Sequence, residues 1–325
     1  MFSVKSRAKR SGSEMLHLRA ITPKDRTDDV CGLLGESPGV TNVVVLPEAA
    51  RQPIGDLVMC DVAREAVNEV IDGLRRLGLE DEGSIALERV DVSISHVAEA
   101  AEENAPGQGD DAVVWEEIDQ RTEEETRFTW SFVTFLVLAT MLAGIAAIID
   151  SSILIVGAMV LGPEFGAMAA ISYGLVRGDR RRIGRALGVL AAGFAVAIVV
   201  TFVCALVGRW TGVIAVDQLP AHRPQTGFVY RPDRWSFIVA VLAGAAGVLS
   251  LTAGKASALV GVFISVTTVP AAGNIAVALA LSHNGEIRGS AIQLGVNLSG
   301  MVIAGAAILL VQKAAWALVH KRRTT

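Results

Sequence analysis

One carboxylate, Glu164, falls near the middle of an apolar stretch that is long enough to cross a lipid bilayer. An ionisable side chain inside a membrane costs about 2.5–3.5 kcal/mol on insertion scales, so it usually lines a cavity or pairs with a partner. A buried carboxyl group of this kind could also exchange protons close to neutral pH. The alternative is that Glu164 begins a helical segment and caps the free backbone amides there.

A second polar group lies in a later apolar stretch, on both sides of Pro270. Thr267, Thr268 and Asn274 present hydroxyl and amide groups there. Together with the backbone carbonyls that proline leaves free, they could bind a polar solute or a cation. They could equally hold neighbouring helices together, which is the commoner role of such residues in membranes.

Both polar groups lie at proline-centred breaks, the first of which reads Gly162-Pro163-Glu164. A hydrocarbon core cannot hydrogen-bond the backbone groups that proline frees, so such breaks persist only where protein or a water-filled cavity covers them. Paired breaks in matching halves of a chain point to a transport site at mid-membrane. The predicted substrate- or ion-binding residues are Gly162, Pro163, Glu164, Gly166, Thr267, Thr268, Pro270, Gly273 and Asn274, and Gln293 and Asn297 are weaker candidates.

The elements that must position these residues are membrane helices. The chain has 325 residues, of which 52% are hydrophobic, and its mean hydropathy of +0.48 is too high for an ordinary soluble domain. Most acidic groups fall in residues 1–128, whereas residues 129–319 contain long runs without charge. Apolar runs of about 20 residues or more predict spanning helices. Six spans are predicted, over residues 129–149, 151–176, 186–208, 235–254, 256–282 and 291–318.

A cluster of arginines between the second and third spans predicts the orientation of the chain. Because positively charged loops stay on the cytoplasmic side, this loop and the basic residues 321–323 predict cytoplasmic termini, in a bacterial cytoplasmic membrane. Binding of anionic lipid or attraction of an anionic substrate is the alternative role of the loop. Arg223, Arg231 and Arg234 lie in a predicted outer loop, against the rule. The loop arginines are Arg177, Arg180, Arg181, Arg182 and Arg185.

The two halves of the membrane region resemble each other at an offset of 107 residues. Three spans in each half would make the second half enter from the opposite side, so the pattern predicts an inverted repeat, the architecture of alternating access. The matched pairs are Pro163 with Pro270, Gly166 with Gly273, Gly178 with Gly285, Asp179 with Glu286, Arg181 with Arg288, and Gly193 with Gly300.

Residues 15–95 read as a soluble α+β domain that follows a polar tail, residues 1–14. The pattern predicts strands near 16–20, 40–46, 55–62 and 84–95, with helices over 27–34 and 63–77. The order β-α-β-β-α-β predicts a ferredoxin-like cytosolic domain with a four-stranded antiparallel sheet. The loop at 22–26 lacks glycine, which favours a dimerising, gating or purely structural role over ligand sensing. The fold alone does not decide between these roles.

An acidic segment, residues 96–128, joins this domain to the transmembrane domain, residues 129–320, which a basic tail, residues 321–325, follows. The segment carries eleven acidic residues against Arg121 and Arg127, and residues 106–109 form a hinge. A solvated linker is the main interpretation, and a cation-collecting vestibule is the alternative. A helix over 112–127 is predicted to continue into the first span.

The sequence contains no enzyme motif that we recognise. Gly254-Lys255 is followed by Ala256 where a phosphate-binding loop needs Ser or Thr, and no Gly-x-Ser-x-Gly occurs. The five histidines are scattered, which disfavours a zinc site. We therefore expect no catalytic residue, no metal site, no cofactor and no nucleic-acid partner.

One string resembles a known family. Ile155-Val156-Gly157-Ala158-Met159-Val160-Leu161-Gly162-Pro163, followed by Ser172-Tyr173-Gly174-Leu175 and a basic turn, is similar to the bacterial hydrophobic membrane proteins grouped as domain of unknown function 389. The resemblance covers about residues 125–320, and residues 15–95 are similar to a module that often precedes that domain. It implies a six-span-like membrane fold and no established substrate. Glu164 stands where the family is expected to be mostly apolar.

These observations predict a secondary transporter of a small polar solute or ion, with its site at the broken second and fifth spans. The rival interpretation is a membrane-anchored sensor or scaffold that acts through the cytosolic domain, and a passive channel is a third. An anchor does not need two central prolines, which places the rival second. The predicted partners are the lipid bilayer, an unidentified solute or ion, and a second copy of the chain in a homodimer.

Overall fold

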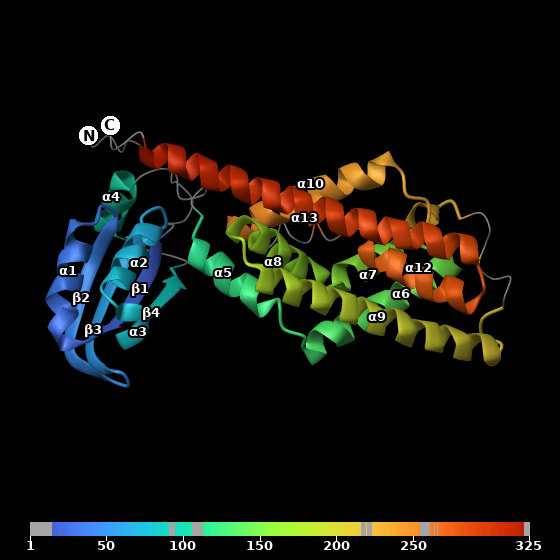
Figure 1. Cartoon of the computed structure of the whole chain (residues 1–325), viewed down its shortest axis with the longest axis horizontal. Helices are drawn as coiled ribbons and strands as arrows, with labels where there is room; N and C mark the ends of the chain where they lie inside the picture. The colour runs from blue at the N-terminus through green and yellow to red at the C-terminus, as the bar shows by residue number, and fades with distance from the viewer. Residues whose placement is uncertain are drawn as a thin grey trace, which may run out of the picture. The chain divides into compact units, whose positions relative to one another are not determined.

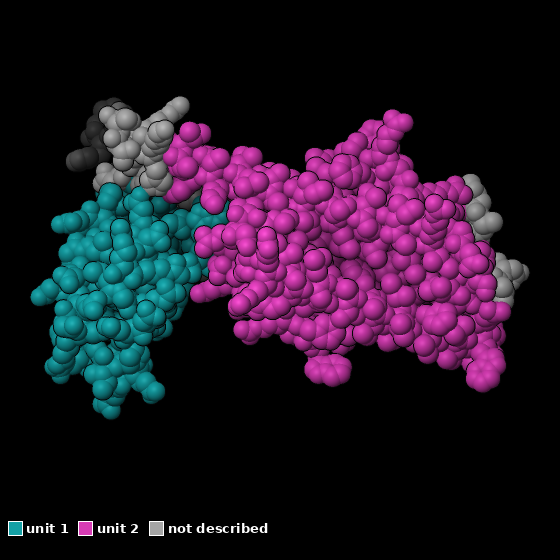
Figure 2. All heavy atoms as spheres, in the orientation of Figure 1, with its two compact units in different colours: residues 1–116 teal, residues 117–325 magenta. Residues whose placement is uncertain are grey.

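The computed structural model describes residues 15–90, 95–105, 113–215, 219, 223–253, 261–262, 264 and 266–321. The chain divides into two compact units, residues 1–116 and 117–325 (Figure 2). Each unit has a hydrophobic core of its own.

The first unit contains one four-stranded sheet, in the order β2-β3-β1-β4. Its strands are β1 (Met15–Thr22), β2 (Val40–Arg51), β3 (Ile54–Ala63) and β4 (Ser84–Arg89), and each neighbouring pair is antiparallel. The main helices are α1 (Thr27–Glu36) and α2 (Val67–Arg76), with the short α3 (Leu79–Glu82) before β4. The predicted β-α-β-β-α-β order of main elements is confirmed.

The core of this unit follows from the alternation of side chains along its strands. Leu16, Leu18 and Ala20 point from β1 to one face of the sheet. They pack with Val30 of α1 and Leu74 of α2 in a single buried cluster. Both helices therefore cover the same face of the sheet.

A further helix, α4 (His96–Asn104), lies within the segment predicted to be a solvated linker. Its Ala98 and Ala101 are buried, and Ala98 packs with Met15 and Ala63 of the sheet. The start of the acidic segment is therefore packed on the first unit. Residues 106–112, which include the predicted hinge, lie outside the described residues.

The second unit is helical (Figure 1). After α5 (Trp115–Glu124), most of which belongs to this unit, come α6 (Trp130–Ile148), α7 (Ser152–Leu161), α8 (Glu164–Arg177), α9 (Arg180–Trp210), α10 (Arg234–Thr252), α12 (Thr268–Ala280) and α13 (Asn284–Lys321). The short helix α12 packs against α6, α9 and α13, whereas α8 packs against α9 and α13. The long helices α9 and α13 run in opposite directions in Figure 1.

Among the described residues of this unit, four helices, α6, α9, α10 and α13, are long and apolar enough to cross a membrane, and α7 with α8 adds a fifth span if the bent pair counts as one. Large apolar side chains on these helices are exposed, for example Val199 on α9 and Ile303 on α13. Trp130, Trp210 and Trp235, at helix ends, are 88%, 93% and 71% exposed. Exposed apolar faces bounded by tryptophan are typical of membrane helices, and we conclude that this is a membrane protein.

Some predicted boundaries differ from the structure. The helix predicted over 112–127 does not continue into the first span, because α5 ends at Glu124 and α6 begins only at Trp130. Backbone bonds from residues 126 and 127 to Glu123 and Glu124 close the turn between them. The six predicted spans are not all observed: α12 has 13 residues, and much of the chain before it lies outside the described residues. In the sheet, β4 is Ser84–Arg89, and residues 91–94, in the strand predicted to reach residue 95, lie outside the described residues.

Candidate functional site

The first predicted break is present at Gly162-Pro163. The axes of α7 and α8 are bent by 55° there. Gly162 ends α7 and Pro163 precedes the first residue of α8, so the ring of Pro163 occupies a position where no helical hydrogen bond is lost. The carboxylate of Glu164 lies against Gly162: a Cβ atom on Gly162 would fall within 2.4 Å of Glu164 Oε2 and 2.8 Å of Val269 Cγ2. Gly162 is therefore needed for the two breaks to approach each other.

We call the non-helical residues 266–267, just before α12, the second break; residues 254–260, 263 and 265 before it lie outside the described residues. Pro270 is the third residue of α12, so it lies in the first turn of the helix, which tolerates proline. The prediction that the chain breaks at Pro270 itself is therefore wrong. Glu164 is the first residue of α8 and Thr268 the first residue of α12. The Thr268 hydroxyl donates a hydrogen bond to Glu164 Oε1. The structure thus joins the starts of two helices through one carboxylate.

Glu164 is 5% exposed, and among the described residues no donor reaches its second oxygen, Oε2. The helices α6, α7 and α12 packed at the breaks contain no ionisable side chain. Burying an ion in a protein costs several kcal/mol. A helix N-terminus returns about 0.3–1 kcal/mol, and up to about 2 kcal/mol where it is partly buried. The two helix starts therefore offset only part of the cost of an ionised Glu164.

Thr267, the residue before α12, forms a second polar contact at the same break. Its hydroxyl oxygen accepts hydrogen bonds from Gln293 Nε2 at 2.9 Å and from Asn297 Nδ2 at 2.5 Å. Both amide side chains come from α13 and are buried, with exposures of 1% and 2%. Gln293 and Asn297, the weaker candidates from sequence, therefore lie at the predicted site.

Gly166 and Gly273 prove to be packing positions. A Cβ atom on Gly166 would collide with the side chain of Glu125, and one on Gly273 would fall 2.7 Å from the carbonyl oxygen of Thr140 and 2.8 Å from the backbone nitrogen of Gly144. Gly273 therefore lets α12 lie directly on the backbone of α6.

Asn274 belongs to a different cluster, which we call the Arg223 cluster: Arg223, Asn274, Glu286 and Ser290. Arg223 Nη1 donates to Asn274 Oδ1 at 2.8 Å, and Arg223 Nη2 forms an ion pair with Glu286. Asn274 Nδ2 donates to Ser290 Oγ at 2.9 Å. The Arg223 side chain is fully buried and lies 4.4 Å from the ring centre of Tyr230. Its burial explains why this arginine departs from the charge rule for outer loops.

Asp150, in the turn between α6 and α7, anchors the loop that carries Arg223. It accepts hydrogen bonds from the backbone nitrogen and the hydroxyl of Thr226, at 2.9 and 2.8 Å. Burial alone would raise the pKa of Asp150, but these bonds, with one from the backbone of Gln225, hold the pKa below its usual value. The loop is therefore fixed over this end of the helices.

One face of α13 carries a stripe of polar side chains that runs from the Arg223 cluster to the contacts of Thr267. Glu286, Ser290, Gln293 and Asn297 are spaced by four, three and four residues, so they lie on the same side of the helix. With a rise of 1.5 Å per residue the stripe is about 17 Å long. We call this stripe, together with Asn274 and Thr267, the polar track. An ionisable side chain in a membrane bundle, such as Glu286, is costly and usually functional, whereas Ser, Asn and Gln side chains more commonly join helices.

The arginine loop lies at the start of α9. This helix of 31 residues ends at Trp210 and is about 46 Å long at a rise of 1.5 Å per residue. Gly178, with φ +75°, ends α8, and Asp179 caps α9 by accepting from the backbone nitrogens of Arg181 and Arg182. The bond from the backbone of Arg182 lowers the pKa of Asp179 below its usual value. The turn at Gly178 and the cap at Asp179 therefore fix the start of α9, and with it the position of the arginines.

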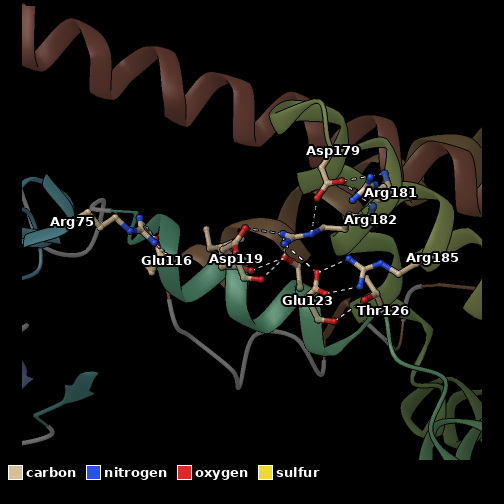
Figure 3. Close-up of polar contacts among 11 residues, drawn as sticks. Arg75, Glu116, Asp119, Glu123, Thr126, Asp179, Arg181, Arg182 and Arg185 are labelled. Carbon is tan, nitrogen blue, oxygen red and sulfur yellow. Dashed lines mark hydrogen bonds and ion pairs between the residues drawn. The ribbon is translucent and has the colours of Figure 1, made fainter. Parts of the chain in front are cut away.

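The arginine loop is covered by α5 (Figure 3). The Arg182 side chain is only 7% exposed, and its Nη atoms lie 2.9 Å from Asp119 Oδ1 and 3.2 Å from Glu123 Oε2. Arg185 forms a two-pronged pair with Glu123, at 2.7 and 3.1 Å. In the first unit, Arg75 pairs with Glu116 at 2.6 Å. Part of the acidic segment therefore neutralises the arginine loop, which the interpretation as a solvated linker did not foresee.

We expect Arg182→Gln to lower the free energy of unfolding by about 1–2 kcal/mol, because the partners of this buried arginine are themselves about one third exposed. Urea unfolding in detergent would measure the change. The matched control is Arg181→Gln, whose side chain is exposed, with an expected change below about 0.5 kcal/mol. Equal losses in both variants would contradict the assigned ion pairs.

Residues 159–303 match the family model described as "Domain of unknown function (DUF389)". The family resemblance read from the sequence is confirmed for this segment. Comparison with curated proteins and comparison with solved structures each gave no match. The DUF389 segment contains both breaks, the Arg223 cluster and the whole polar track.

Two residues that the structure joins to the candidate site were missed by sequence reasoning. Arg223 was read only as an exception to the charge rule, and Glu286 only as one member of a repeat. The signal that could have found them was the combination of both observations, since an arginine in a loop predicted to be outer departs from the charge rule and a buried arginine needs a partner.

Proposed function

We propose that this membrane protein is a secondary transporter that moves a small polar solute or ion by alternating access, with its site at the two helix breaks. The observation that carries the proposal is the hydrogen bond from Thr268 to Glu164, which joins two half-helix starts inside an apolar bundle. Backbone that is not helical is tolerated at membrane depth only where it is buried in protein or lines a cavity. An anchor has no need of such a contact.

Packing within the two halves supports the inverted repeat that alternating access requires. Gly193 and Gly300, matched in sequence, occupy equivalent contacts: Gly193 lies against Phe132 of α6, and Gly300 against Ala240 of α10. The short half-helices α8 and α12 occupy equivalent places in the two halves, and α9 and α13 are the long third helices. Both α8 and α12 pack on both α9 and α13. Exchange of the halves therefore preserves these contacts.

The two ends of the bundle supply candidate gates. Each has a buried arginine beside one of the two tyrosines of the chain: Arg182 lies 5.0 Å from the ring centre of Tyr173, and Arg223 lies 4.4 Å from that of Tyr230. The acid of each repeated turn takes part, Asp179 at one end and Glu286 at the other. In our proposal, opening of either end requires that its ion pairs separate.

We place the protein in a bacterial cytoplasmic membrane with both termini in the cytoplasm, on the charge of the arginine loop and of the basic residues 321–323. We assign the first unit, as a ferredoxin-like domain, a regulatory or dimerising role. Val44, Leu46 and Ile54 are exposed on its β2–β3 hairpin, at 45%, 44% and 80%, which supports contact with another protein surface. We assign the chain no catalytic step.

The test is the accessibility of Thr268, which is fully buried in the described structure. A single cysteine would be introduced as Thr268→Cys after replacement of Cys31, Cys60 and Cys204 by alanine. Alternating access predicts that a membrane-impermeant maleimide labels this cysteine from either side of sealed vesicles, because each conformation opens the site to one side.

Ala272→Cys provides the matched control, because Ala272 lies one turn further along α12 and is also fully buried. It should stay unlabelled from both sides. If Thr268→Cys is as unreactive as this control, alternating access at the breaks is refuted, and the interpretation as a sensor or scaffold is favoured. Simultaneous labelling from both sides in one conformation would favour a channel.

A further inference from the structure

Two buried oxygen atoms at the breaks have no hydrogen-bond donor among the described residues: Glu164 Oε2 and Gln293 Oε1. They come from helices that are far apart in sequence, α8 and α13. The contacts of Thr268 with Glu164, and of Thr267 with Gln293, bring both side chains to the start of α12. Two buried acceptor oxygens without donors, on side chains that bond the adjacent residues Thr267 and Thr268, indicate a ligand that accepts lone pairs.

The charge at this place is also uncompensated. The described parts of α6, α7 and α12 hold no cationic side chain, and Arg223 is already engaged by Glu286 and Asn274. Glu125, whose side chain lies against Gly166 of α8, supplies no positive charge either. An ionised Glu164 therefore lacks a cationic partner on α6, α7 and α12, which a bound cation would supply.

The donor set favours a hard cation. Carboxylate, amide and hydroxyl oxygens, with the carbonyls free at the end of α7, suit alkali and alkaline-earth ions rather than transition metals. Among the described residues no group of three His, Cys, Asp or Glu side chains gathers that could hold a divalent ion. One carboxylate with neutral oxygens matches a charge of +1.

We propose that Glu164 Oε2 and Gln293 Oε1 are ligands of a site for a monovalent alkali cation of the size of Na⁺. The inference rests on the proposed function in one respect: the cation is then either the cargo or the coupling ion of the transporter. Thr267 and Thr268 position the two ligands of the site. The site lies at the end of the polar track that contains Thr267 and Gln293.

The experiment measures the thermal unfolding midpoint of the purified full chain in detergent, at fixed pH and ionic strength, in NaCl, LiCl, KCl or choline chloride. A ligand at ten times its dissociation constant should raise the midpoint of a unit of about 200 residues by about 3–6 °C. We expect that rise with Na⁺, and none with choline, which is too large for the site.

Variants locate the effect. Glu164→Gln keeps the shape of the side chain and removes its charge, so the Na⁺ rise should disappear. Gln293→Leu should reduce the rise as well. Gln312→Leu is the matched control: Gln312 is also on α13, its amide nitrogen also bonds a threonine, Thr252, and its oxygen is also without a donor, yet it lies five turns away. This control should keep the full rise.

An equal response to every salt, a response retained by Glu164→Gln, or a loss shared by Gln312→Leu would each overturn the site. Stabilisation that follows pH but not Na⁺ would overturn it too, in favour of a proton. Failure of the site is distinguishable from failure of transport, because unfolding is measured without flux. If the unmodified protein shows no Na⁺ rise but Thr268→Cys is labelled from both sides, the cation site alone is refuted. If the Na⁺ rise is present but Thr268→Cys stays unlabelled, transport alone is refuted.

Discussion

Replacement of Arg223 by glutamine should destabilise the second unit by about 3–5 kcal/mol. The substitution removes a guanidinium whose side chain is fully buried and leaves Glu286, which is 12% exposed, as a charge without its partner. It also removes the bond to Asn274. Urea or thermal unfolding of purified protein in detergent, followed by the near-ultraviolet signal of the tryptophans, would measure the loss.

Arg231→Gln is the matched control for this prediction. Arg231 also lies near the ring of Tyr230, at 5.2 Å, but its side chain is exposed and an effect below about 0.5 kcal/mol is expected. Combination of Arg223→Gln with Glu286→Gln should recover part of the loss, because the unpaired charge is removed. A double variant as unstable as the sum of the two single variants would show that the pair is not coupled.

Replacement of Gly273 by valine should cost about 2–3 kcal/mol, because the new side chain would push α12 away from α6. Even its Cβ atom would lie 2.7 Å from Ala143 Cβ and 2.7 Å from the carbonyl oxygen of Thr140, and the backbone there cannot yield locally. The same unfolding measurement applies. Since α12 begins at the candidate site, we also expect the labelling of Thr268→Cys to change in this variant.

Gly188→Val serves as the control for Gly273→Val. Gly188 lies on the exposed side of α9, and nothing lies within 4 Å of the position of its Cβ atom. An apolar side chain there should change stability by less than about 0.5 kcal/mol. Similar losses in both variants would mean that valine is unfavourable in these helices in general, and that close approach of α12 to α6 is not the cause.

These two predictions concern different requirements of the proposed transporter. Arg223 holds a loop closed over one end of the bundle, and Gly273 sets the position of the half-helix that begins at the breaks. If the ends act as gates, Arg223→Gln should favour labelling of Thr268→Cys from the Arg223 side. Gly273→Val should instead alter labelling from both sides, because it moves the site itself.

Much of the fold could be predicted from the sequence. The order of strands and helices in the first unit follows from side-chain alternation and helical spacing, which depend only on neighbouring residues. The bend between α7 and α8 follows from Pro163, because proline cannot continue a hydrogen-bonded helix. The arginine loop between α8 and α9 was likewise visible as a break in an apolar run.

The candidate site could be predicted only in part. Glu164, Thr267 and Thr268 lie where the breaks placed them, but Asn274, two turns further along α12, faces Arg223 and Glu286 instead. Spacing along one helix shows which residues share a face, yet it does not show which other helix that face meets. The same reason explains why α5 was taken for a solvated linker although it pairs with Arg182.

By itself, then, the sequence determined that the chain is a membrane protein with an α+β unit before it, and that one span is broken at a proline beside a buried acid. Local forces suffice for these features: apolar length, alternation and the missing amide of proline. Only the tertiary structure decided that Glu164 meets Thr268 across 104 residues and that Arg223 meets Glu286 across 63. Such contacts depend on how helices distant in the chain pack, and packing is set by the summed shape of all their side chains.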